Sequence, residues 1–342
     1  MSILNIGMTS QARPLSSIKL PGQRKRCVAQ RLLKLYSACV HTAAQPSHED
    51  TVRVVCVSDT HNTRPQLPFG DVLIHAGDLT ENGSFDEIQT ELSWLSSQAH
   101  RYKVFVAGNH DVLLDGEFLE KHPERRYGSS QSKEDLDWGS VIYLQNSSTT
   151  LDFPRNPDNA SGFETTSTAE QTVSSARRLI IYGSPFTPQY GTSAFQYSPD
   201  PHFWAEIFAP LVRMKPDILV THGPPKLHLD ARDFHRAGCP YLSGEVARIR
   251  PKLHVFGHIH TSYGREDAVL DGMQRAYEDV MIGWGSWGTV GWMLARTIWE
   301  ELALLFRGFQ PRAVDLTTTF INAAVVGGHD NKLVNPAVIF NL

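Results

Sequence analysis

The sequence predicts an α/β fold in which strands alternate with helices. Six apolar, β-branched runs are too short for helices, which is typical of buried strands. Two stretches between them, 85–98 and 201–215, have helical spacing of their apolar residues. This alternation indicates a layered α/β architecture. The strand-like runs are 52–58, 71–75, 102–107, 179–182, 217–220 and 252–256.

Composition sets limits on size and function class. The 342 residues favour about two domains, although one large α/β domain of this size is common. A net charge of −4 gives no reason to expect that the surface as a whole binds nucleic acid. The four cysteines form no CxxC pair, which indicates free thiols in a reducing compartment. No apolar run near the N-terminus has the length of a signal peptide, so a cytoplasmic location is expected.

Residues 1–50 form a basic leader. They carry seven Lys/Arg against two acidic residues, 7 − 2 = +5, which leaves −4 − 5 = −9 for residues 51–342. The segment 23–34 has the pattern of a basic amphipathic helix. Such a leader is typical of a mitochondrial transit peptide, and a disordered or loosely docked extension is the alternative. The expected organisation is therefore a leader followed by one domain over 51–342.

Two segments interrupt that domain. The polar segment at 156–175 is expected to be an exposed loop. The segment 280–309 interleaves glycine with tryptophan, and its uncharged part, 280–295, is shorter than the roughly 20 residues that span a bilayer. Peripheral membrane contact and a buried or oligomer-forming insert are both compatible with it.

Five short motifs each follow one of the strand-like runs. Loops that leave the carboxyl ends of strands in an open α/β sheet converge on one crevice, where ligands bind. The motifs therefore point to a single site. They are Asp59-Thr60-His61, Gly77-Asp78, Gly108-Asn109-His110-Asp111, Thr221-His222-Gly223 and Gly257-His258-Ile259-His260.

The residue types in these motifs suit a metal site. Aspartate and neutral histidine bind Mn, Fe, Zn or Ni, and no cysteine lies in any motif. Asp78 could bridge two ions, and Asn109 offers a neutral oxygen that limits negative charge where a phosphate must bind. Each motif alone has an ordinary explanation as a helix cap, a turn or a strand end. Only the five together, each after a strand, require a common site.

The order of these motifs resembles that of the calcineurin-like metallophosphoesterase superfamily. The resemblance covers roughly residues 51–275, and 334–340 looks like a closing strand. The phrases YGSPF at 182–186, THGPPKLHLD at 221–230 and RPKLHVFGHIH at 250–260 are similar to its metallophosphoesterase-domain-containing branch. The resemblance implies a four-layer α/β/β/α sandwich of two mixed sheets flanked by helices.

The resemblance also implies a role for each motif residue. Two divalent ions, with Mn favoured among Mn, Fe, Zn and Ni, would be bridged by Asp78, and a hydroxide between them would attack the phosphate ester. His110 would act as general acid on the leaving group. Asp111 would either orient the His110 ring or cap the segment 112–118. The remaining ligands would be Asp59, His61 and His260 at one ion and Asn109, His222 and His258 at the other.

The functional prediction is a dinuclear phosphoesterase acting on a small phosphate ester, with a cyclic nucleotide as one candidate. A nuclease of the same metal chemistry is an alternative that the acidic body disfavours. A non-catalytic scaffold is a second alternative, and a protein Ser/Thr phosphatase ranks lower. The oligomeric state is not predicted.

Overall fold

The computed structural model describes residues 22–42, 51–128, 130–154, 177–232, 235–308, 310, 312–314, 317–328 and 330–342. The chain divides into two compact units. A small helical unit comprises Met1–Cys39 and Ala276–Gln310, and a larger unit comprises Val40–Arg275 and Pro311–Leu342. The predicted polar loop at 156–175 lies outside the described residues.

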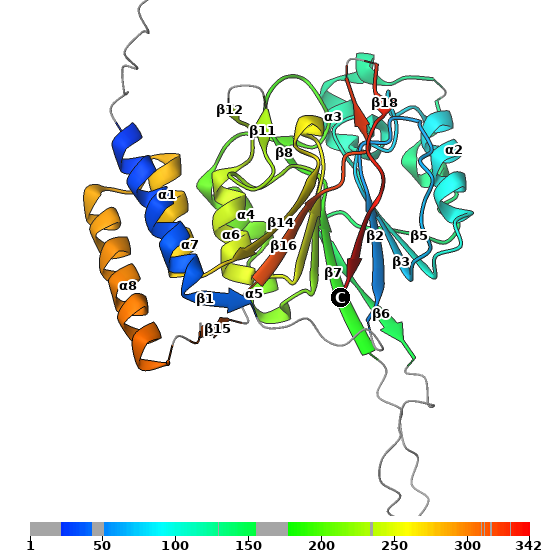
Figure 1. Cartoon of the computed structure of the whole chain (residues 1–342). Coiled ribbons are helices and arrows are strands. Elements are labelled where there is room, and N and C mark those ends of the chain that lie inside the picture. The colour runs from blue at the N-terminus through cyan, green and yellow to red at the C-terminus, as the bar shows by residue number, and fades with distance from the viewer. Residues whose placement is uncertain are drawn as a thin grey trace, which may run out of the picture. The chain divides into compact units, whose positions relative to one another are not determined.

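The larger unit contains two main sheets (Figure 1). In the five-stranded sheet, four parallel strands are joined at one edge by the antiparallel strand β19. Its strands, in spatial order, are β19 (Val338–Asn341), β2 (Arg53–Val57), β3 (Val72–Ala76), β4 (Tyr102–Val106) and β5 (Val141–Tyr143).

The six-stranded sheet also has a parallel centre. Strands β16, β13, β10 and β7 run parallel, while β14 and β6 are antiparallel at the two edges. Its strands, in spatial order, are β14 (Gly264–Val269), β16 (Thr317–Asn322), β13 (Leu253–Phe256), β10 (Ile218–Thr221), β7 (Arg177–Ser184) and β6 (Ser147–Phe153).

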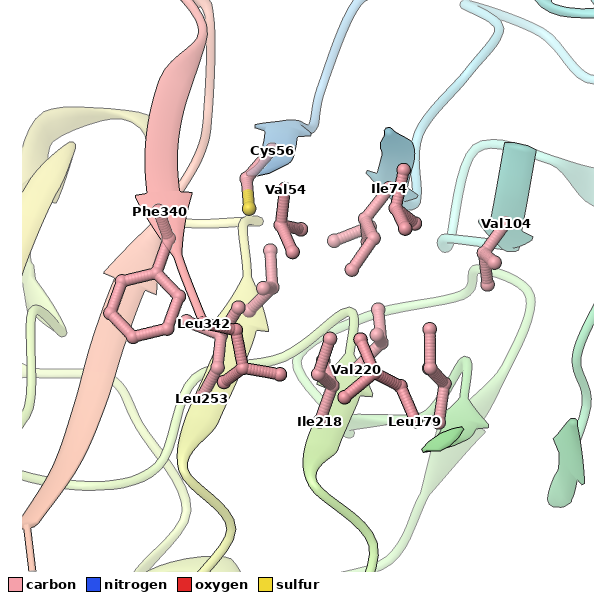
Figure 2. Packing of buried hydrophobic residues seen from close by; sticks show 14 of the residues in the cluster. Val54, Cys56, Ile74, Val104, Leu179, Ile218, Val220, Leu253, Phe340 and Leu342 are labelled. Carbon is pink, nitrogen blue, oxygen red and sulfur yellow. The ribbon is translucent and has the colours of Figure 1, made fainter. Parts of the chain in front are cut away.

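Side chains alternate between the two faces of each sheet and thereby create three apolar layers. On β2, Val54 and Cys56 point between the sheets, where they share one core with Ile218 and Val220 of β10 (Figure 2). Val55, the residue between them, belongs to the core on the outer face. Both faces of the central strands are buried, which explains why these strands appear as continuous apolar runs in the sequence.

Helices cover the outer face of each sheet. Helix α2 (Phe85–Ser96) packs Ile88, Leu92 and Leu95 onto the five-stranded sheet, and a capping box of Ser84 with Glu87 begins it. Three helices cover the six-stranded sheet in the same way: α4 (Pro201–Ile207), α5 (Leu211–Met214) and α6 (Pro240–Ile249). The predicted four-layer α/β/β/α fold is therefore confirmed.

Short elements fill the connections of the larger unit. They are β1 (Val40–Thr42), η2 (Val112–Leu114), α3 (Gly116–Lys121), η3 (Pro123–Arg125), η4 (Lys133–Asp135), β8 (Thr187–Pro188), β9 (Gln196–Tyr197), β11 (Ala231–Arg232), β12 (His235–Arg236), η6 (His260–Ser262), β15 (Arg312–Val314), β17 (Val326–Gly327) and β18 (Lys332–Leu333).

The six predicted strands are all present, with small changes at their ends. The predicted helix over 201–215 is instead two helices, because α4 ends at Ile207 and α5 begins at Leu211, after Pro210. Proline lacks the N–H that a continuous helix would need at this point. The predicted closing strand over 334–340 is β19, which begins only at Val338.

The helical unit contains α1 (Gln23–Ala38), most of α7 (Gly272–Ile282) and α8 (Trp287–Phe306). The predicted helix at 23–34 is confirmed and continues to Ala38. Helix α1 packs against α8, so the leader and the segment 280–309, which the sequence treats as separate features, form one unit. None of the helices in the described residues is long and apolar enough to cross a bilayer.

Candidate metal centre

The seven predicted metal ligands converge at the carboxyl ends of five strands. Their loops leave β2, β3 and β4 of one sheet and β10 and β13 of the other. Six of the seven fall into two compact groups, in each of which one potential ligand atom per residue lies within 4.8 Å of the others. The groups are Asp59 with His61 and His260, and Asp78 with His222 and His258.

In the first group, Asp59 is fully buried and holds two motifs together. Its carboxylate accepts hydrogen bonds from the backbone N–H of His258 at 2.9 and 3.0 Å. Oδ1 of Asp59 also lies 3.2 Å from Nε2 of His260. One side chain therefore fixes the β2 loop of the five-stranded sheet against the β13 loop of the six-stranded sheet.

In the second group, His222 is fully buried and has a defined orientation. Its Nδ1 donates to the backbone oxygen of Ala76 at 2.9 Å, so Nε2 faces the other ligands. Nε2 lies 3.1 Å from Oδ1 of Asn109 and 3.3 Å from Oδ2 of Asp78. Asn109 thereby joins this group, as the sequence predicts.

Asp78 lies between the two groups. Its Oδ2 is 3.3 Å from Nε2 of His222 and 3.8 Å from Nε2 of His61. Its Oδ1 accepts the backbone N–H of His110 at 2.8 Å, which fixes the carboxylate plane. A single carboxylate oxygen therefore faces a histidine nitrogen from each group.

Four of the ligands have left-handed backbone conformations that are uncommon for residues other than glycine. The φ angles are 54° at Asp59, 43° at His61, 52° at Asp78 and 66° at His258. Such conformations cost on the order of 1–3 kcal/mol each and persist where surrounding structure enforces them. This strain turns the side chains at the strand ends toward one point.

Two motif glycines are required by close packing around the ligands. A Cβ at Gly77, where φ is 101°, would collide with Nδ1 of His222. A Cβ at Gly257 would collide with the Asp59 carboxylate and with Ser58. The glycines in the GD and GHxH motifs therefore allow loops from both sheets to meet.

The charges of the site fit cations. Asp59 and Asp78 are buried carboxylates, and within the described residues their ion pairs are with histidines alone. Burial raises the pKa of Asp78, but the neighbouring His222 outweighs it and holds that pKa well below its usual range. Burial lowers the pKa of His222, but Asp78 outweighs it and raises that pKa to about 9. Each carboxylate thus requires positive charge nearby.

A polar atom without a partner points to the same conclusion. Nε2 of His61 is buried and has no hydrogen-bond partner, although it faces Asp78. Buried polar atoms normally form hydrogen bonds, and a metal ion satisfies a nitrogen lone pair equally well. The donor set of carboxylate, imidazole and amide oxygen therefore fits divalent metal ions.

Glu81 lies in the site and was not predicted from the sequence. Its Oε2 lies 3.1 Å from Nδ1 of His61, and Asn331 donates to the same carboxylate at 2.8 Å. The backbone oxygen of Glu81 accepts from Nδ1 of His110 at 2.7 Å. Its position three residues after Asp78 matches no motif, and its acidic side chain in the same loop was the one available signal.

The structure corrects both predicted roles of Asp111. The carboxylate forms no hydrogen bond with the His110 ring, whose Nδ1 donates to the backbone oxygen of Glu81 instead, and it forms no capping bond at the start of η2. It accepts the N–H groups of Gly108, Leu79 and Thr80 and the Thr80 hydroxyl. These hydrogen bonds tie the Asp78 loop to the Asn109 loop. Burial raises the pKa of Asp111 to about 6.

A pocket of about 520 Å³ opens onto the ligands. His110 lines it beside His61, with ring centroids 4.7 Å apart. Two further lining residues were missed from the sequence: Tyr190, whose ring lies 5.2 Å from that of His258, and the exposed Arg232 of β11. Burial raises the pKa of Tyr190 to about 12, so its hydroxyl stays protonated.

The chain is similar in sequence to several known proteins. The chain is 39% identical over 234 residues to human metallophosphoesterase domain-containing protein 1, a match that covers 66% of this chain and 64% of that protein. It is 42% identical over 283 residues to a probable rhamnogalacturonate lyase C of Emericella nidulans. That match covers 82% of this chain and 23% of the relative. The chain thus spans less than two thirds of either relative.

The family assignment rests on the region that holds the ligands. The model of the calcineurin-like phosphoesterase family matches residues 40–262, which include all seven predicted ligands. A UPF0046 protein of Caenorhabditis elegans is 31% identical over 229 residues, covering 62% of this chain and 65% of that protein. The chain belongs to the calcineurin-like phosphoesterase family.

Proposed function

We propose that the chain is a dinuclear-metal-dependent phosphoesterase that hydrolyses a small phosphate ester. The observation that supports this most strongly is the position of Asp78. Its Oδ2 faces Nε2 of His61 on one side and Nε2 of His222 on the other. A carboxylate in this position can be shared by two cations.

Each group of ligands would hold one ion. Asp78 would belong to both, and Mn²⁺ is the ion we expect to support activity, since this donor set suits it. Two adjacent divalent ions supply an activated water and neutralise charge on the phosphoryl oxygens. The individual ligands would be Asp59, His61 and His260 for one ion, and Asn109, His222 and His258 for the other.

His110 would protonate the leaving group. Its Nδ1 donates to the backbone oxygen of Glu81, so Nε2 is the nitrogen left to face the pocket. The hydrogen bond from its backbone N–H to Asp78 keeps the ring beside the bridging carboxylate. A histidine held in this way can transfer a proton to an ester oxygen.

The pocket favours a small ester with a planar group. Its volume of about 520 Å³ is in the range of small-molecule sites. Arg232 offers a cation for phosphoryl oxygens, and Tyr190 offers an aromatic ring beside the ligands. A cyclic nucleotide combines both features, whereas the net charge of −9 over residues 51–342 disfavours a polyanion.

The experiment is a metal-dependent activity screen. The purified chain is stripped with a chelator and assayed on bis-p-nitrophenyl phosphate after addition of Mn²⁺, Fe²⁺, Zn²⁺, Ni²⁺ or Mg²⁺. Cyclic nucleotides, phosphomonoesters and single-stranded DNA are then compared with the best metal. We expect loss of activity on stripping, recovery with Mn²⁺, and a preference for cyclic nucleotides over DNA.

Two outcomes would contradict the proposal. Preference for DNA would favour a nuclease of the same chemistry. Tight metal binding without hydrolysis of any ester would favour a non-catalytic scaffold.

A further inference from the structure

Helix α8 exposes a broad apolar side and buries a side of mixed polarity. Eight large apolar side chains, here called the apolar arc, are 47–90% exposed. At 100° per residue they cover one broad side of the helix, with Glu301 at its border. The arc consists of Trp287, Trp292, Leu294, Ile298, Trp299, Leu302, Leu305 and Phe306.

The opposite side of α8 combines apolar residues with polar ones. Val290 and Met293 are buried there together with Thr297 and Glu300. The Glu300 carboxylate lies 2.7 Å from the guanidinium of Arg296 and also pairs with Arg307. The helix thus has its ion pairs inside and its tryptophans outside, the reverse of a helix whose outer face meets water.

Helix α1, which packs on α8, is strongly basic. Its 16 residues include five Lys/Arg and no Asp or Glu. Four of the five side chains are exposed, and none of these four forms an ion pair with any described residue. They are Arg24, Arg26, Arg31 and Lys34.

Helices α1 and α8 pack side by side, so the basic side chains and the apolar arc belong to one pair of helices. Nζ of Lys25 donates to the backbone oxygen of Gly285 at 2.5 Å, which brings the start of α1 to the start of α8. Further along, the Arg296 guanidinium lies 5.9 Å from the centre of the Tyr36 ring. Free cations of α1 therefore accompany the tryptophans of α8 in one compact unit.

From this combination we infer that the helical unit docks in the plane of an anionic membrane surface. The apolar arc enters the boundary between head groups and acyl chains, where tryptophan is enriched, and α1 binds acidic head groups. The 20 residues of α8 would span about 30 Å along the surface. The sequence of 280–309 was compatible with peripheral membrane contact, and the basic helix α1 adds a preference for anionic lipid.

Charge favours lipid over a second copy of the chain. A symmetric dimer through the apolar arc would bring together two helical units that each carry four exposed cations, which adds repulsion between the copies. An anionic bilayer instead neutralises these cations. A membrane also covers a broad convex helix side without needing a complementary groove.

The test is co-sedimentation of the full chain with vesicles of phosphatidylcholine alone or with about 30% phosphatidylserine. We expect at least roughly tenfold stronger binding to the phosphatidylserine vesicles at low salt, and weaker binding at 500 mM NaCl. Tryptophan emission should shift to shorter wavelength on binding. Equal binding to both vesicles, or no binding, overturns the inference.

The first variant removes the apolar arc while keeping helix-forming residues: Ile298→Gln, Trp299→Gln and Leu302→Gln. We expect at least roughly tenfold weaker vesicle binding. The matched control is Phe69→Ser, since Phe69 is 75% exposed in the larger unit and should not affect binding. Equal losses in both variants would overturn the inference.

The second variant neutralises α1 with glutamine at its four exposed cations. It should abolish the preference for phosphatidylserine while the thermal unfolding midpoint stays near that of the parent chain. A different result would overturn the inference: the parent chain forms a stable dimer without lipid and does not bind vesicles, and the apolar-arc variant is monomeric. That result would assign the apolar arc to a second copy of the chain. The substitutions are Arg24→Gln, Arg26→Gln, Arg31→Gln and Lys34→Gln.

Discussion

The two main sheets contribute different chemistry to the same centre. The five-stranded sheet supplies every carboxylate among the predicted ligands, Asp59 and Asp78, and also the proposed acid His110. The six-stranded sheet supplies imidazoles alone: His222, His258 and His260. Both carboxylates thus come from one sheet and three of the four imidazoles come from the other, so cations would bind at the junction of the two.

The scaffolding behind these ligands is nevertheless the same in both sheets. Thr60, after β2, lies 2.9 Å from Nε2 of His75 on β3, and Thr221, at the end of β10, lies 2.9 Å from Nε2 of His254 on β13. Each hydroxyl also donates to a backbone carbonyl, so it accepts from the histidine. The sheets therefore differ in the ligands that they present and not in how they anchor the loops.

Removing a carboxylate from the five-stranded sheet should have the largest effect. Asp78→Asn takes away the charge that both ligand groups face, so kcat/KM on bis-p-nitrophenyl phosphate should fall at least ~10²-fold. The matched change Asp152→Asn, at an exposed position on β6, should leave kcat/KM unchanged. If Asp78→Asn kept nearly the activity of the parent chain, the carboxylates of the five-stranded sheet would not have the larger role proposed for them.

Removing the proposed general acid should slow the reaction of some substrates more than that of others. We expect His110→Ala to reduce kcat about 10²-fold on an alkyl phosphodiester, but much less on a p-nitrophenyl ester, whose leaving group needs little protonation. Steady-state rates on the two substrates give the ratio. Equal losses on both would show that His110 is not the acid.

Removing an imidazole from the six-stranded sheet should be milder. His260→Gln removes a neutral donor 3.2 Å from Asp59 and leaves both carboxylates in place. Apparent Mn²⁺ affinity should weaken about tenfold, and saturating Mn²⁺ should restore most activity. Activity titrations with Mn²⁺ measure this, and a loss that no Mn²⁺ concentration rescues would contradict it.

The two buried histidines that bond to Thr60 and Thr221 should make the stability of the chain depend on pH. Burial lowers the pKa of His75 and of His254 to about 3. The unfolded chain therefore binds more protons between roughly pH 6.5 and 3, and stability falls as pH decreases through this window. His254→Leu should reduce the slope of the unfolding free energy of the metal-free chain by about 1.4 kcal/mol per pH unit.

Denaturant titrations at several pH values measure that slope. The matched control is His202→Leu, which removes an exposed histidine in place of a buried one. An unchanged slope in His254→Leu would mean that this histidine is not neutral in the folded chain.

The sequence was informative where one physical constraint dominated. Strands buried on both faces must be apolar throughout, so β2, β3, β4 and β10 were visible as runs of β-branched residues. Asp, His and Asn at the carboxyl ends of strands are candidate metal ligands, so the motifs identified residues that the structure brings together.

Features that depend on tertiary packing could not be predicted from the sequence. The contact of Glu81 with His61 and the true partners of Asp111 arise only when loops from different strands meet. The left-handed backbone at Asp59 is imposed by its surroundings, and no residue pattern marks it. The pairing of α1 with α8 joins segments some 250 residues apart, so neither segment predicts the other.

The central claim is that two cations share Asp78, and metal counting tests it most directly. The chain is saturated with Mn²⁺, passed through gel filtration and analysed by mass spectrometry for Mn per chain. We predict two ions in the parent protein and fewer than two in Asp78→Asn. A parent protein that retains no more than one ion at saturation, or an Asp78→Asn variant that retains both, would contradict the claim.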